Sequence, residues 1–239
     1  MFFKKQKPIK IEFYTHVGQL MELFPPTLAT EALPSWFEKL PSKAGRNVKH
    51  CVGIKDLFSK GIMIPLWSDY TVDLDSRKAP AVNCPATKQY PLYPPAEAHN
   101  LSEQAPGAWP GYQNVKFTSP WLVYTSEPIK WACVQAVWNQ HDPQQYTVVP
   151  GVIEFKYQNQ LSVNTLWKNS PTPRTEKLKA GDSILQLIPV TDKPFEIEVK
   201  FLNQEIFSQK FTRWEYSFDL QYHKIKSLFE KRENKKCKY

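Results

Sequence analysis

PGVIEFKYQNQLSVNTLWKNSPTPRTEKLKAGDSILQLIPV, residues 150–190, is the stretch that decides the fold of this chain. A short apolar run opens it, a turn that carries Tyr157 follows, and an alternating segment comes next. After a Pro- and charge-rich loop, Gly181 and Asp182 make a turn into a third apolar run. Short runs rich in β-branched and aromatic residues and bounded by turn formers predict β-strands.

The same pattern continues on both sides of this stretch. Seven successive runs rich in β-branched and aromatic residues follow residue 115: 115–125, 129–138, 146–155, 160–167, 183–190, 195–202 and 205–216. Turn formers separate most of these runs, which is typical of antiparallel sandwiches and small barrels. We therefore predict a mainly β fold, an antiparallel sandwich or small barrel, with its β-rich core at residues 111–218.

The segments outside this core are less regular. Residues 1–75 predict a mixed α/β part: a strand at 9–14, a helical turn around Trp36, a helix at 48–60 and two strands within 62–74. The Pro-rich segment 76–110 predicts a long irregular surface connection. Residues 219–239 predict a C-terminal helix that ends in a basic tail. We interpret residues 1–239 as a single domain.

Composition restricts the class of protein. The 239 residues are 41% hydrophobic and 14% aromatic, which is enough for a full core. No apolar run approaches the roughly 20 residues of a membrane-spanning helix, and the first residues lack the apolar segment of a signal peptide. We therefore expect no membrane association and a cytoplasmic location. Four dispersed cysteines favour free thiols over two disulfides: Cys51, Cys84, Cys133 and Cys237.

The net charge of +8 is concentrated at one end of the chain. Residues 221–239 contain seven basic and two acidic side chains, a net charge of +5, so the other 220 residues are nearly balanced. A basic end of this kind can bind nucleic acid or phosphate, or can be an ordinary solvated terminus. The candidate residues for such binding are Lys231, Arg232, Lys235 and Lys236.

Five motifs occur in order along nearly the whole chain: PPTLATEALPSWFEKLP (25–41), HCVGIKDLFSKGIMIPLWSDY (50–70), FTSPWLVYT (117–125), PGVIEFKY (150–157) and LKAGDSILQLIPV (178–190). Together with the Lys-rich end, they resemble an uncharacterised protein family of tailed marine phages (cyanophage type) and some bacteria. The resemblance implies a phage-type protein that resides in the cytoplasm of an infected host cell or in the virion. It implies no activity.

Residues 150–190 alone are also similar to the β-clip scaffold of trimeric dUTPases and dCTP deaminases. This resemblance places Glu154 where those enzymes have the Asp that activates water, Tyr157 at the Tyr of the base-binding hairpin, and Gln186 in the final strand. Asn159 stands where the hairpin Gly is expected, and residues 118–121 lack the Arg and Gly of a phosphate-binding segment. The similarity therefore implies a β-clip scaffold without its chemistry.

Aromatic residues are the other candidate feature. Exposed Trp and Tyr side chains anchor protein partners or stack on sugars and bases, but buried ones fill β-sheet cores. The partner-binding candidates are Trp121, Tyr124, Trp131 and Trp138. Asp69, Asp73 and Asp75 form either a solvated strand face or a cation-binding cluster. No His spacing matches a metal site.

We therefore expect a non-enzymatic, phage-type binding protein, either virion-associated or an accessory factor, that associates with a protein partner or with itself and needs no cofactor. One alternative is a divergent nucleotide-binding enzyme on a dUTPase-like scaffold, which would use Glu154, Tyr157 and Gln186 with Mg²⁺. A second alternative is a carbohydrate-binding module that uses the tryptophans.

Overall fold

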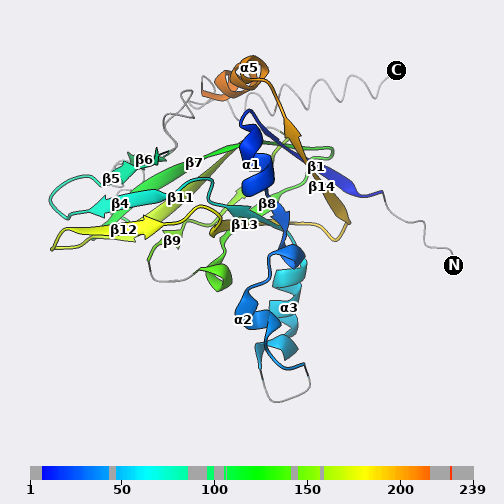
Figure 1. Cartoon of the computed structure of the whole chain (residues 1–239), viewed down its shortest axis with the longest axis horizontal. Helices are drawn as coiled ribbons and strands as arrows, with labels where there is room; N and C mark the ends of the chain where they lie inside the picture. The colour runs from blue at the N-terminus through cyan, green and yellow to red at the C-terminus, as the bar shows by residue number, and fades with distance from the viewer. Residues whose placement is uncertain are drawn as a thin grey trace.

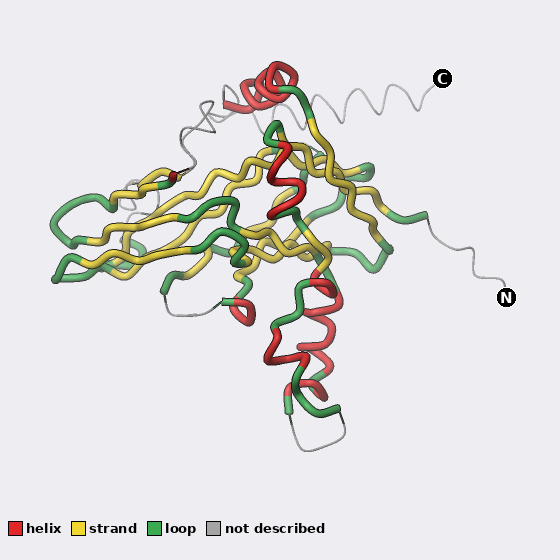
Figure 2. The backbone as a smooth tube through the Cα atoms, viewed as in Figure 1, coloured by secondary structure: helices red, strands yellow, loops and turns green. Residues whose placement is uncertain are grey.

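A computed structural model describes residues 7–42, 47–85, 96–99, 105, 107–140, 145–156, 159–215 and 227. This part of the chain is mainly β, as predicted, with a few short helices (Figures 1 and 2). Its strands form three open sheets and no closed barrel, so the sandwich is confirmed and the barrel is not.

The first sheet has six described strands. Five lie in the order β14 (Phe195–Phe201), β1 (Ile9–Thr15), β7 (Tyr112–Thr125), β11 (Gln160–Lys168) and β9 (Thr147–Val148), and β6 (Ala96–His99) also pairs with β7. The long strand β7 is central, because β11 pairs along one edge while β6 and β1 share the other.

The opposite layer consists of two smaller sheets. One has the order β10 (Gly151–Ile153), β8 (Trp131–Gln135), β13 (Ser183–Pro189), β3 (Ile62–Pro65) and β2 (Thr27–Leu28); the other has β12 (Arg174–Leu178), β4 (Tyr70–Leu74) and β5 (Ala81–Asn83). The chain crosses between these two sheets twice, from β3 to β4 and from β12 to β13. Two backbone hydrogen bonds of 2.8 Å join the crossings: the Leu66 amide donates to the Asp182 carbonyl, and the Gly181 amide donates to the Leu66 carbonyl.

Alternating side chains of both layers fill the core between them. In β4, Tyr70, Val72 and Leu74 are buried while the residues between them are half-buried. The Tyr70 ring meets Phe117 of β7 edge-on, with 5.1 Å between ring centroids. Buried residues of both layers belong to one continuous cluster, which is the expected core of a two-layer sandwich.

The structure corrects the prediction of a strand at 205–216. This segment is the helix α5 (Gln204–Glu215). Asn203 begins the helix, because its side-chain oxygen accepts a hydrogen bond of 2.8 Å from the Ile206 amide. Buried Phe207 packs on Leu122 of β7 and holds the helix against the sheet.

The strands differ from the prediction in three further details. The Pro- and charge-rich segment after residue 170 was expected to be a loop but contains β12, which pairs with β4. β1 and β14 pair in parallel, from Ile9 with Phe195 to Thr15 with Phe201, so the sandwich is not purely antiparallel. Residues 146–155 also divide into β9 and β10, which belong to different layers.

The N-terminal part supplies strands to all three sheets and most of the helices. Besides α5, the described helical elements are α1 (Gly18–Leu23), the 3₁₀ turns η1 (Ala29–Glu31), η2 (Val48–His50) and η4 (Val137–Asn139), and the short helices α2 (Ser35–Glu38) and α3 (Val52–Ser59). The expected strands and helices before residue 75 are confirmed. Within 76–110, the structure adds β5 and β6.

Within the described ranges, no helix has both the length and the apolar composition needed to cross a membrane. Cys51, Cys84 and Cys133 are not in disulfide bonds, as expected, whereas Cys237 lies outside the described residues. Burial raises the pKa of the Cys133 thiol to about 11, so this thiol is protonated at neutral pH.

Candidate functional site

The helices α2 and α3 project from one side of the sandwich (Figure 1). We call α2, η2, α3 and the described residues beside them, 34–42 and 47–60, the helical projection. Pro34 precedes the first turn of α2, and Lys49 holds its other end, because its ammonium group donates to the carbonyls of Glu38 at 3.0 Å and Leu40 at 2.7 Å. The Asn47 side chain accepts from the Lys49 amide and begins η2.

Gln186 fixes this projection to the sheet. Its side-chain amide leaves the outer face of β13 and donates to the carbonyls of Leu57 at 2.7 Å and Lys60 at 2.8 Å, at the end of α3. A small apolar cluster, made of Ala29, Met63 and Ala136, packs on the same face of the sheet. The helices are therefore held at a defined position on the sandwich.

An exposed pair of tryptophans lies where the projection meets η4. Trp36 of α2 is 39% exposed and Trp138 of η4 is 37% exposed, and their ring centroids are 5.7 Å apart. The Trp36 indole donates to the Trp138 carbonyl at 3.1 Å. The Asn139 side-chain amide donates to the Ala32 carbonyl at 2.6 Å, so two hydrogen bonds join segments about one hundred residues apart.

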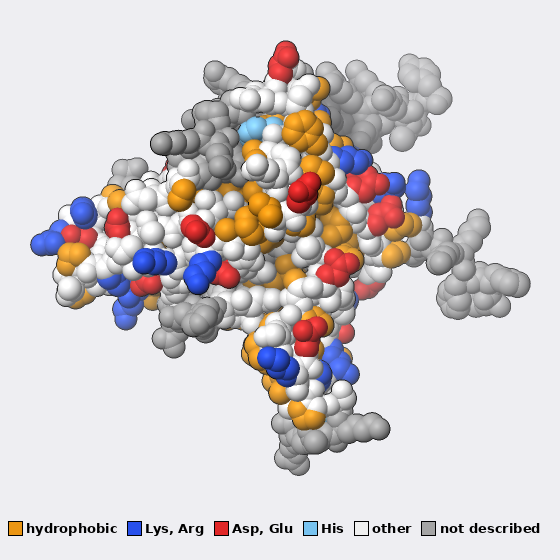
Figure 3. All heavy atoms as spheres, viewed as in Figure 1, with side chains coloured by type: hydrophobic (Ala, Val, Ile, Leu, Met, Phe, Trp, Pro, Cys, Tyr) orange, Lys and Arg blue, Asp and Glu red, His pale blue; other side chains and the backbone are white. Residues whose placement is uncertain are grey.

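These two tryptophans and Val137 form a surface that we call the aromatic face. Val137 is 40% exposed. Beside Trp36 lies an open groove of about 750 Å³, which is lined by Trp36, Leu40, Asn47, Val48, His50, Cys51 and Ile54. In the space-filling view, hydrophobic side chains are visible along the helical projection (Figure 3). Large exposed aromatic and aliphatic groups on a rigid base are the usual anchors of protein–protein interfaces.

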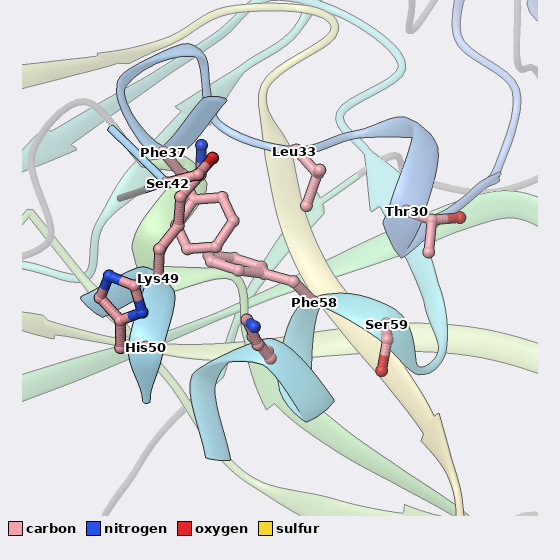
Figure 4. A pocket seen from close by; sticks show the side chains of 9 residues that line it. Thr30, Leu33, Phe37, Ser42, Lys49, His50, Phe58 and Ser59 are labelled. Atoms are coloured by element: carbon pink, nitrogen blue, oxygen red, sulfur yellow. The ribbon is translucent and has the colours of Figure 1, made fainter. Parts of the chain in front are cut away.

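A second hollow of about 380 Å³ lies between α2 and α3 (Figure 4). Buried Phe37 and Phe58, with ring centroids 4.6 Å apart, contribute its aromatic surface. The remaining lining residues are Thr30, Leu33, Ser42, Lys49, His50, Lys55 and Ser59. Trp36 and Phe37 are neighbours in the chain, yet Trp36 lines the open groove and Phe37 lines the hollow between the helices.

The four aromatic partner-binding candidates have different environments. Trp121 and Trp131 are fully buried in the sandwich, where they contact Phe13 and Phe155, so neither offers a surface to a partner. Tyr124 is half-buried below α5, with the Lys210 ammonium 5.0 Å from its ring centroid. Of the four candidates, Trp138 is the most exposed, at 37%.

The structure does not bring Glu154 and Gln186 together within the chain. Glu154 follows β10 and is 9% exposed, whereas the Gln186 side chain binds the end of α3. Through the pairing of β10, β8 and β13, the two residues lie four positions apart along the strands, which corresponds to about 13 Å. Tyr157 lies outside the described residues, as do Lys231, Arg232, Lys235 and Lys236.

Residues 118–121, which align with the phosphate-binding segment of the β-clip enzymes, lie inside β7. Thr118 and Ser119 are buried, and the Ser119 hydroxyl accepts from the Trp121 amide at 3.2 Å. Because Thr118, Ser119 and Trp121 are buried, this segment does not present its backbone amides to a triphosphate in solvent.

The three aspartates of β4 and its flanks have separate partners. Asp69 accepts from the Ala180 amide, Asp73 from the Thr175 hydroxyl, and Asp75 from the Arg77 guanidinium. The hydrogen bonds from Arg77 hold the pKa of the Asp75 carboxyl far below its usual range. In the ranges that the structure describes, no three His, Cys, Asp or Glu side chains are grouped as metal ligands.

The sequence reasoning missed most of the residues that form this site. It predicted a helical turn around Trp36 and did not single out Lys49, His50 or Lys55. Adjacent residues of a helix point in different directions, so a helix as short as α2 cannot bury both Trp36 and Phe37 on one side. The Trp-Phe pair in a short helix is therefore a sequence signal that one of the two rings is exposed. Nothing in the sequence indicates that Trp36 meets Trp138.

Comparisons of the chain with protein-family models, curated proteins and solved structures found no match.

Proposed function

We propose that this protein is a non-enzymatic binding protein, of the phage type indicated by its sequence motifs, and that it engages another protein through the aromatic face. The observation that carries the proposal is the exposed Trp36–Trp138 pair, which is held by a hydrogen bond on a base fixed to the sheet. An exposed indole that is already ordered loses little conformational entropy when a partner covers it.

The placement of the enzymatic candidates favours binding over nucleotide chemistry. Catalytic groups must be positioned to well under an ångström, and Glu154 and Gln186 are separated by about 13 Å along the strands of this chain. Sugar binding by Trp121, Trp131 and Trp167 is also disfavoured, because all three side chains are buried.

The test is a comparison of three proteins used as bait in lysate of host cells: wild type, the double variant Trp36→Ala/Trp138→Ala, and Trp109→Asn. Trp109 is 50% exposed and lies away from the projection in sequence, so it is a control for the loss of an exposed indole. Asn suits this position because the backbone φ of Trp109 is 44°, a conformation that Asn tolerates.

We expect wild type and Trp109→Asn to capture the same specific protein from the lysate. The double variant should bind this protein at least about 30-fold more weakly. Light scattering distinguishes a second copy of the chain, which would appear as a dimer that the double variant breaks. Equal binding by the double variant would refute the proposal. A wild-type monomer that captures no specific protein would refute it as well.

A further inference from the structure

The hollow between α2 and α3 has the composition of a ligand site and not of a packing defect. It has a volume of about 380 Å³, at the lower end of the range for small-molecule sites. Phe37, Phe58 and Leu33 provide apolar wall, and the hydroxyls of Thr30, Ser42 and Ser59 lie at its margin (Figure 4). Apolar walls with a few polar groups are typical of such sites.

The charge of this hollow has one sign. Lys49 and Lys55 line it together with His50, and none of the described lining residues is acidic. Within the described part of the chain, neither ammonium group has a carboxylate within ion-pair distance. Two cations at an apolar wall favour an anion, because the wall keeps water away and strengthens the attraction.

Lys49 is already held in place for such an anion. Its ammonium group donates to the carbonyls of Glu38 and Leu40 and lies 5.7 Å from the centroid of the Phe37 ring. An ammonium group has three donors, and these two bonds leave one for a ligand. Because its position is fixed by the fold, little side-chain entropy is lost on binding.

We propose that this hollow binds a small organic anion, a carboxylate or phosphate on an aromatic or other apolar body. The anionic group lies against Lys49 and Lys55, and the apolar body contacts Phe37, Phe58 and Leu33. This site is separate from the aromatic face, because Phe37 faces the hollow between the helices while Trp36 faces the groove.

The probes are four small molecules that share a phenyl group: phenylacetate, phenyl phosphate, neutral phenylacetamide and cationic phenethylamine. Binding to the full chain is followed at low salt by titration calorimetry and by chemical shifts of the protein. We expect saturable binding of at least one anion, at least about fivefold tighter than the neutral amide. The preferred anion distinguishes carboxylate from phosphate as the natural group.

Three variants locate the binding. Lys55→Gln removes a lining cation, and we expect it to weaken anion binding about fivefold while binding of the amide is unchanged. Lys39→Gln makes the same charge change on the projection outside the hollow and should have no such effect. Leu33→Trp fills the hollow and should abolish binding, with an unchanged circular dichroism spectrum as the check on folding.

Equal affinity for the anions and the amide would overturn the proposal, as would an equal loss in Lys39→Gln and Lys55→Gln. Failure of all four probes to bind would overturn it too. None of these results depends on the aromatic face, which these variants leave intact.

Discussion

At the scale of single residues, Gln186 connects two parts of the molecule. The sequence placed it in a strand that resembles a nucleotide-binding enzyme, and its amide instead binds the last carbonyls of α3. The carbonyls at a helix end have no partners within the helix, so a side chain that reaches them from a sheet fixes the helix to that sheet. This is a structural role for a residue that only the dUTPase-like alternative would have placed in an active site.

Replacement of Gln186 by Ala should lower the free energy of unfolding by about 2 kcal/mol, because two hydrogen bonds are lost and two carbonyls at the helix end lose their partner. Urea denaturation followed by tryptophan fluorescence measures the change. Gln209→Ala on the exposed side of α5 is the control, with an expected change below about 0.5 kcal/mol. Equal losses in the two variants would contradict this role of Gln186.

The residue scale is also where sequence reasoning was weakest. Local alternation cannot distinguish a core indole from a surface indole, so Trp121, Trp131 and Trp138 were grouped although two are fully buried and one is 37% exposed. Whether an indole is buried depends on which strand of the opposite layer packs on it, and that strand is distant in sequence. The resemblances to a phage family and to the β-clip enzymes stay predictions.

At the scale of elements, the turn at Gly61 determines how α3 leads into β3. Gly61 has a φ of +96°, and a Cβ atom there would lie 2.2 Å from the carbonyl oxygen of Leu187 in β13. Both the backbone conformation and this close approach require glycine. Gly53, within α3, has a negative φ and open space around it.

Gly61→Ala should therefore destabilise the protein by at least about 3 kcal/mol, because the strained turn must move β3 away from β13. Gly53→Ala should stabilise it by about 0.5–1 kcal/mol, because alanine favours the helix and faces no obstacle. Thermal and urea denaturation of both variants measure whether the free energy of unfolding falls or rises. A Gly61→Ala protein as stable as wild type would show that the turn is not as described.

Sequence predicts an element correctly where its hydrophobic pattern and its length indicate the same structure. It fails where contacts with distant parts of the chain decide the structure instead. Strands β1, β4, β7, β11 and β13 alternate or stay apolar, and the sequence predicts each of them. α5 is aromatic enough to look like a strand, and its helical state depends on the Asn203 cap and on packing of Phe207. β12 is charged because it is an edge strand, so it lacks the apolar signal.

At the scale of the whole molecule, the sandwich is a rigid base to which the helical projection, with its binding surface, is fixed. The layers bury one continuous core, and the projection is joined to them by Gln186, by Asn139 and by the Trp36 indole. Sequence predicts the mainly β class, because composition and strand spacing determine it. It does not predict the projection, since contacts between α2 and η4 span about one hundred residues.

The measurement that tests the binding function most directly is amide hydrogen exchange of the chain, alone and with the protein recovered by capture. Our account predicts slower exchange in α2, η2 and η4 on binding, with exchange in β5 and β12, which lie away from the projection (Figure 1), unchanged. Slower exchange confined to β5 and β12, with α2 and η4 unaffected, would contradict it.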